Sequence, residues 1–176
     1  MEIIKCTVPD SFTICDMSDL HLGSPNCAEE TLQEVVAKIH DTKDCYVIFK
    51  GDAIEAILPN DKRYLHSAVR EGLQSPKAQA DRVIDLFKPI RKRILGWGIG
   101  NHELKLWNTM DFGKYIADQL ETPYGAYNFK LHFLTKNNEL MFKTYHTHGM
   151  GGMVTQDGAR QQARLARTLA PQGLGC

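Results

Sequence analysis

The sequence predicts an α/β layered domain, because short apolar runs that suit buried strands alternate with segments of helical periodicity. Three such strands are expected at residues 12–17, 45–49 and 93–99. Apolar side chains at helical spacing from Leu32 onward predict a helix over 27–40, between the first two strands. This alternation indicates a sheet in which the carboxyl ends of the strands lie at the same edge.

The remaining elements follow from local boundary signals. Ser75 offers a capping hydroxyl in front of Pro76, which predicts the start of a helix that runs to about Lys88. Further helices are expected at 60–70, 111–120 and 157–169, and a hairpin is expected from 127–134 and 140–145. All 176 residues are expected to form one domain.

Composition and charge are those of an ordinary globular domain. Apolar residues make up 43% and charged residues 24%, while Lys+Arg and Asp+Glu both number 21. The resulting zero net charge excludes the broad basic surface of a non-specific nucleic-acid binder, although a local basic patch would still allow a nucleic-acid substrate. No apolar run approaches the ~20 residues that a membrane span needs, and no signal peptide is recognised. No membrane partner is therefore expected.

The cysteines indicate a reducing compartment. They number five, an odd count, and no pair has CxxC spacing. Cys15 and Cys45 lie in strand-like runs, where a free thiol behaves as a small hydrophobe. We therefore expect a cytoplasmic protein without a disulfide framework or a thiolate zinc site.

Polar side chains follow each of the predicted strands. They are Asp19, His21, Asp52, Asn101, His102 and His148. Because layered α/β folds place their sites at the carboxyl ends of strands, these side chains are expected to meet. Carboxylates, imidazoles and an amide oxygen suit divalent ions such as Mn, Fe, Zn, Co or Ni. Each motif alone is a weak signal, since Asp-x-His occurs by chance and Gly-Asp also marks ordinary turns.

Two further residues are interpreted from their neighbours. Glu103 follows His102 directly and is expected to orient a ring nitrogen of this candidate acid. Strand alternation places His146 and His148 on the same face, so that one or both are candidate ligands. The glycines after His148 would let the backbone approach a phosphate.

The order of these motifs resembles that of the calcineurin-like metallophosphoesterases. Asp-x-His, Gly-Asp, Gly-Asn-His-Glu and His-Gly follow one another, each after a predicted strand, from about Phe12 to the end of the chain. The resemblance implies a two-sheet sandwich flanked by helices, an αββα arrangement, over residues 1–176. It also implies a dinuclear centre that activates a water for attack on a phosphoester.

The resemblance assigns a role to each matching residue. Asp19 and His21 would bind the first metal, and Asp52 would bridge both metals. The second metal would be bound by the remaining pair, Asn101 and His148. His102 would assist the leaving group or the phosphoryl oxygens. His146 matches no required position and is interpreted as a residue that contacts a metal ligand without binding the metal itself.

The sequence departs from the family at one point. The family closes its site with Gly-His-x-His after one more strand, and none of the seven histidines lies in such a motif. We therefore expect a fragment that lacks its C-terminal strands, with natural degeneration of the site as the alternative. The missing ligands and the exposed sheet edge predict weaker metal binding, lower stability and little or no activity for this form.

The leading hypothesis is a manganese- or similar metal-dependent hydrolase of phosphomonoesters or phosphodiesters. Its expected partner is a phosphoester substrate, with nucleic acid and nucleotides as candidates, because relatives that process DNA ends share these motifs. The alternative is a non-catalytic scaffold of the same fold with an incomplete metal site. A simple metal-binding module is the third reading. No Ser-His-Asp or Cys-His nucleophile and no P-loop competes with these.

Overall fold

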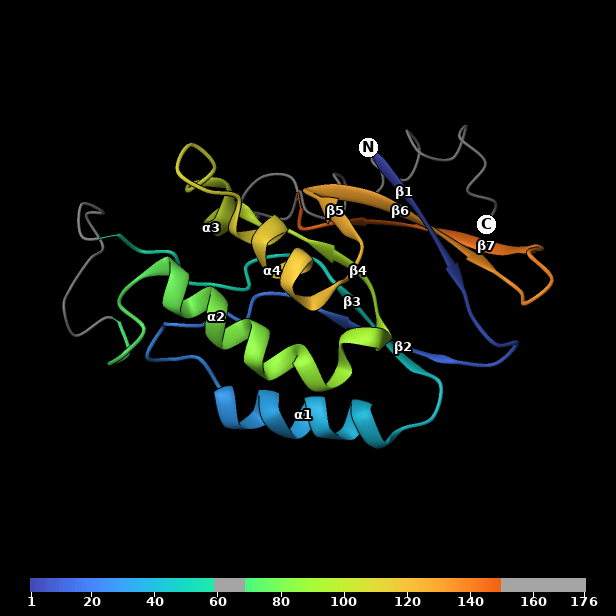
Figure 1. Ribbon diagram of the computed structural model, residues 1–176, viewed down its shortest axis with the longest axis horizontal. Coiled ribbons are helices and arrows are strands. Elements are labelled where there is room, and N and C mark those ends of the chain that lie inside the picture. Colours follow the sequence, from blue (N-terminus) through green and yellow to red (C-terminus); the bar gives the residue numbers. More distant parts are fainter. Residues whose placement is uncertain (59–68, 150–176) are drawn as a thin grey trace, which may run out of the picture.

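The computed structural model describes residues 1–58 and 69–149. Within them, two β-sheets lie face to face, and helices cover the free side of one sheet (Figure 1). The protein is thus a mixed α/β structure with two sheets. No helix covers the free side of the other sheet within these ranges, so the outer helical layer of the expected αββα arrangement is not part of the described structure.

The larger sheet has four parallel strands in the order β2-β3-β4-β5. Their bounds are β2 Thr13–Met17, β3 Cys45–Phe49, β4 Ile94–Gly98 and β5 Tyr124–Ala126. Parallel neighbours need crossover connections, and helices supply them. Consequently the carboxyl ends of β2, β3 and β4 meet at one edge of this sheet.

The helices between these strands pack on one face of the four-stranded sheet (Figure 1). They are α1 Glu29–Asp41, α2 Pro76–Phe87, the 3₁₀ segment η2 Lys88–Arg93 and α4 Phe112–Leu120. The one-turn helix α3 Asn101–Leu104 lies beyond the carboxyl end of β4 (Figure 1). The hydroxyl of Ser75 accepts a hydrogen bond from the backbone N–H of Ala78, which is the predicted cap of α2. Phe49, Phe87 and Trp97 form the aromatic centre of the layer between sheet and helices.

The second sheet has three strands in the order β1-β6-β7. Strand β1 (Glu2–Thr7) runs parallel to β6 (Asn128–Leu134), which forms an antiparallel hairpin with β7 (Leu140–Thr147). A separate apolar cluster joins the two sheets, with Ile48 and Leu95 on one side and Phe129, Leu131 and Phe133 on the other. The hairpin delivers the end of β7 to the edge where the parallel strands end (Figure 1).

Most predicted elements that fall on described residues are confirmed within a few residues. The structure also has elements that the sequence did not predict: strands β1 and β5, the 3₁₀ segment η2, and a helix at 101–104 where a loop is expected. The helix predicted at 157–169, and all but the end of the one predicted at 60–70, lie outside the described residues. In the described part of the chain, no helix has the length and apolar character required to cross a bilayer.

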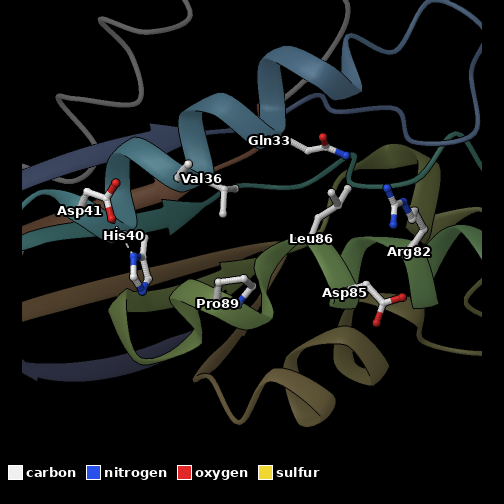
Figure 2. Close-up of a pocket in the computed structure, with 9 residues that line it drawn as sticks. Gln33, Val36, His40, Asp41, Arg82, Asp85, Leu86 and Pro89 are labelled. Atoms are coloured by element: carbon white, nitrogen blue, oxygen red, sulfur yellow. Dashed lines mark hydrogen bonds and ion pairs between the residues drawn. The ribbon is translucent and has the colours of Figure 1, made fainter.

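A groove of about 410 Å³ runs between α1 and α2 on the helical side (Figure 2). Val36, Leu86 and Pro89 form its apolar floor, and His40 and Arg82 lie at its margins. It shares no lining residue with the cleft at the strand ends. The chemistry expected from the sequence therefore has to be sought at the strand ends.

Candidate metal centre

The loops after β2 and β3 are joined by backbone hydrogen bonds that fix the positions of their side chains. The N–H of Asp19 donates to the carbonyl of Gly51, and the N–H of His21 donates to that of Asp52, both at 3.0 Å. Asp19, His21 and Asp52 have φ angles of 58°, 47° and 53°, in the left-handed region that non-glycine residues rarely adopt. Such backbone strain concentrates at functional sites, where it directs side chains toward a common point.

His21 lies beside the two aspartates that the sequence assigned to the first cation. Its Nε2 is 3.9 Å from Oδ1 of Asp19 and 3.8 Å from Oδ2 of Asp52. These separations exceed a hydrogen bond. They remain short enough for one cation, about 2.0–2.2 Å from each ligand atom, to lie between the two atoms of either pair. One imidazole and two carboxylates therefore form a group that suits a divalent ion.

His148 lies on the other side of Asp52. Its Nε2 is 3.1 Å from Oδ2 of Asp52 and 3.1 Å from Oδ1 of Asn101. Asn101 begins α3 directly after β4, and His148 follows β7, so both sheets contribute to this group. The same oxygen of Asp52 thus faces two imidazoles, His21 and His148, that come from different sheets.

Asp52 is the buried centre of the cluster, with 2% of its surface exposed. Burial alone would raise the pKa of its carboxyl, but the hydrogen bonds from His148 and from the backbone of His102 bring this pKa below its usual value. The same hydrogen bond to Asp52 raises the pKa of His148. Negative charge is therefore held at Asp52, as a bridging ligand requires.

Two glycines allow the loops after β3 and β4 to approach each other. A Cβ at Gly51 would meet the backbone of Ile99 and Gly100, and a Cβ at Gly100 would meet the carboxylate of Asp52. Gly51 also has a φ of 119°, which L side chains rarely adopt. Glycine at both positions is thus required for Asp52 and Asn101 to lie in one site.

Glu103 has a different role from the predicted one. It was expected to orient His102, but its carboxylate accepts hydrogen bonds from four backbone N–H groups. These belong to Asp52, Ala53, Ile54 and Gly100, at 2.7–3.2 Å. Burial raises the pKa of the Glu103 carboxyl, and the backbone N–H groups oppose that shift. Glu103 therefore ties the loop after β3 to the loop after β4.

His102 is oriented instead by the main chain of Glu55. Its Nδ1 lies at hydrogen-bond distance from the carbonyl oxygen of Glu55, so Nδ1 carries the proton. The His102 ring meets the His21 ring edge to face, with centroids 4.6 Å apart. This arrangement leaves Nε2 as the nitrogen able to exchange a proton with a substrate oxygen.

His146 does not share a face of the site with His148. Its ring stacks on Phe129, with centroids 5.3 Å apart, and Nε2 lies 2.7 Å from the hydroxyl of Thr144. Burial lowers the pKa of His146, and its nearest acidic group is Asp16, at 4.0 Å. These contacts place His146 in the core between the sheets. His148 points elsewhere because the chain bends at His148–Gly149, where φ of Gly149 is 126°.

A cleft of about 470 Å³ opens beside His21 and His102. Its lining residues are Asp19, Leu20, His21, Ser24, Asn26, Cys27, Ala28, Glu55 and His102. None of these lining residues is a lysine or arginine, while two carry carboxylates. The metal-free cleft therefore has an acidic character that would repel a phosphate.

The donor set fits divalent cations. Asp19, Asp52 and His148 offer ligand atoms within 4.8 Å of one another, so Asp19 is grouped with His148 and not with His21 as the resemblance implied. His21 belongs to a second group of the same size, with Glu55 and His102. The sequence-based set lacked Glu55. The signal was a single acidic residue inside the apolar stretch 53–58, where an unpaired carboxylate would be costly to bury.

Comparison of the chain with protein-family models, curated proteins and solved structures finds no match.

Proposed function

We propose that this chain is a metal-dependent phosphoesterase of the calcineurin-like kind, with a dinuclear centre built around Asp52. One observation carries the proposal: Oδ2 of Asp52 lies 3.8 Å from Nε2 of His21 and 3.1 Å from Nε2 of His148. A buried carboxylate oxygen flanked by two imidazoles from different loops suits a carboxylate shared by two neighbouring cations.

Each cation would have a defined set of protein ligands. Asp19 and His21 would hold one, Asn101 and His148 would hold the other, and Asp52 would contact both. When bound, such a pair lowers the pKa of a water molecule and neutralises the phosphoryl oxygens. The chain itself contributes the fixed positions of the ligands, which the left-handed loops and the Glu103 carboxylate maintain.

His102 is the residue we assign to proton transfer. With Nδ1 bound to the carbonyl of Glu55, its Nε2 faces the region beside His21 where a substrate would lie. A histidine in that position can donate a proton to the departing oxygen or a hydrogen bond to a phosphoryl oxygen. No covalent intermediate with the protein is needed.

The charge of the cleft supports dependence on metal. Among the residues that the structure describes, Asp19 and Glu55 contribute carboxylates to it and no lysine or arginine lines it. A phosphoester would be repelled by these carboxylates unless cations offset them. The substrate is accordingly a phosphomonoester or a phosphodiester, nucleotides and nucleic acid included, that binds through the cations.

Metal-dependent hydrolysis tests the proposal. The full chain would be stripped with EDTA, reloaded with Mn²⁺, and assayed on 4-nitrophenyl phosphate and on bis-4-nitrophenyl phosphate. We expect slow turnover that requires Mn²⁺ and is lost in His148→Gln. His40→Gln is the matched control, because His40 is exposed on α1.

Three outcomes are informative. Hydrolysis that needs both Mn²⁺ and His148 supports the proposal. Binding of Mn²⁺ without hydrolysis of either ester favours the non-catalytic scaffold. Hydrolysis that survives EDTA, or that is unchanged in His148→Gln, contradicts a centre built from these residues.

A further inference from the structure

Glu55 contacts both histidines of the cleft, and nothing in the motif pattern assigns it a role. Its carbonyl oxygen contacts Nδ1 of His102, and its carboxylate oxygen Oε2 lies 3.1 Å from Nδ1 of His21. The Glu55 side chain is 14% exposed, so its charge is largely withdrawn from water. A carboxylate in such a position is costly unless a positively polarised group faces it.

The two nitrogens of His21 face different partners. Nε2 faces Asp19 and Asp52, whereas Nδ1 faces Glu55. Because the ring lies between Glu55 and the aspartates, the Glu55 carboxylate reaches the cluster through His21. Within the described residues Nδ1 of His21 makes no hydrogen bond, although the Glu55 oxygen lies close enough to accept one.

The backbone around Glu55 is anchored on both sides. Its N–H donates to the carbonyl of Leu22, next to His21, and the neighbouring residue Ile54 forms a bridge with Leu22. The segment that carries Glu55 and the segment that carries His21 therefore move as one unit. This fixed register brings the carboxylate to the imidazole without a long flexible loop.

We propose that Glu55 is a positioning residue, which fixes the ring orientation and the Nδ1–H tautomer of His21 so that Nε2 can bind a cation. A histidine ligand commonly donates its other ring N–H to a carboxylate, and such partners are typically worth 10–100-fold in metal affinity. The inference rests on the proposed metal centre, and it adds a residue that acts through His21.

The test measures Mn²⁺ affinity by isothermal titration calorimetry on the full chain and on Glu55→Ala and Glu55→Gln. We expect Glu55→Ala to weaken binding by about 10–100-fold. Glu55→Gln retains an oxygen acceptor and should recover part of that loss. Glu139→Gln, an exposed glutamate in the turn between β6 and β7, is the matched control and should bind as the wild type does.

A second readout separates positioning from a general effect on folding. Long-range ¹H–¹⁵N NMR of the metal-free protein reports which ring nitrogen of His21 carries the proton. We expect the Nδ1–H form in the wild type and a shift toward Nε2–H in Glu55→Ala. The Glu55 carbonyl is unaltered by these substitutions, so the His102 tautomer should not change.

The failures are distinguishable. If the wild type does not bind Mn²⁺, both the proposed function and the role of Glu55 are contradicted. If the wild type binds Mn²⁺ and Glu55→Ala binds it equally well with the same His21 tautomer, only the role of Glu55 is overturned. A lower melting temperature with unchanged affinity likewise overturns the positioning role.

Discussion

The strand-end edge and the interior between the two sheets each hold buried side chains, but they are built on opposite principles. In the interior, the ring of Phe129 fills the space left by Gly96 and Gly98, where an added Cβ would lie 2.7 Å and 3.1 Å from it. At the edge, Asp52 and Glu103 are each 2% exposed and carry carboxyl groups. Apolar packing joins the two sheets, while hydrogen bonds to carboxylates join the loops.

This difference explains which region needs a ligand. An apolar interior is stable without any bound species, because burial of its rings removes them from water. A cluster of carboxylates and imidazoles on a left-handed backbone costs stability, and bound cations would offset part of that cost. The edge is therefore expected to respond to metal and the interior to packing.

The largest effect is expected from Asp52→Asn. Because both proposed cations contact this carboxylate, Mn²⁺-dependent hydrolysis should fall by about 10⁴-fold, or about 5 kcal/mol. The free energy of unfolding of the metal-free protein should change by less than about 1 kcal/mol, since asparagine retains the acceptor for the His102 N–H. Steady-state kinetics and urea unfolding measure the two quantities. Activity within tenfold of the wild type would refute the bridging role.

Phe129→Ala is expected to have the reverse profile. Loss of this fully buried ring should lower the free energy of unfolding by about 3–5 kcal/mol, because a cavity remains between the sheets. Urea unfolding followed by circular dichroism measures it, with Phe129→Leu as the milder control. A loss below about 1 kcal/mol would show that the interior is not the main source of stability.

The loss of stability expected for Glu103→Gln lies between those of Asp52→Asn and Phe129→Ala. The amide can accept from only part of the set of backbone N–H groups that the carboxylate now satisfies, so about 2–4 kcal/mol of stability should be lost. Urea unfolding of the metal-free protein tests this. Glu34→Gln on the exposed face of α1 should change stability by less than about 0.5 kcal/mol. Equal effects of the two substitutions would remove the assigned role of Glu103.

The smallest effect concerns the thiol of Cys6, on the interior side. Burial raises the pKa of the Cys6 thiol to about 11, above its ordinary value of 9.0. A raised folded-state pKa stabilises the protein below about pH 9, and this contribution is lost as the pH rises toward 11. At pH 8, iodoacetamide should modify Cys6 more slowly than the half-buried Cys15, and the two rates should become equal in urea. Mass spectrometry of the alkylated peptides decides; faster reaction at Cys6 in the folded protein contradicts its burial.

Much of the fold could be predicted because its signals are local. Apolar runs that are followed by polar residues identified β2, β3 and β4, and the same pattern placed Asp19, Asp52 and Asn101 after the ends of these strands. Strand β1 escaped prediction because its identity as a strand depends on pairing with β6, more than 100 residues away. A short exposed segment carries no local mark of such a partner.

Side-chain partners were the least predictable part of the site. Glu103 was assigned to its sequence neighbour His102, yet it reaches the backbone of the loop after β3. His146 was paired with His148 by strand alternation, which fails where the chain leaves β7. Glu103 contacts a loop distant in sequence, whereas the ring of His146 packs on Phe129 of the paired strand, and neither contact follows from residue spacing within one segment.

The proposed function depends on two cations that bind around Asp52. Isothermal titration of the EDTA-treated chain with Mn²⁺, combined with metal analysis of the dialysed protein, measures their number directly. We predict two bound ions per chain in the wild type and none retained in Asp52→Asn. Retention of the same number of ions by both proteins would contradict the centre proposed at the strand ends.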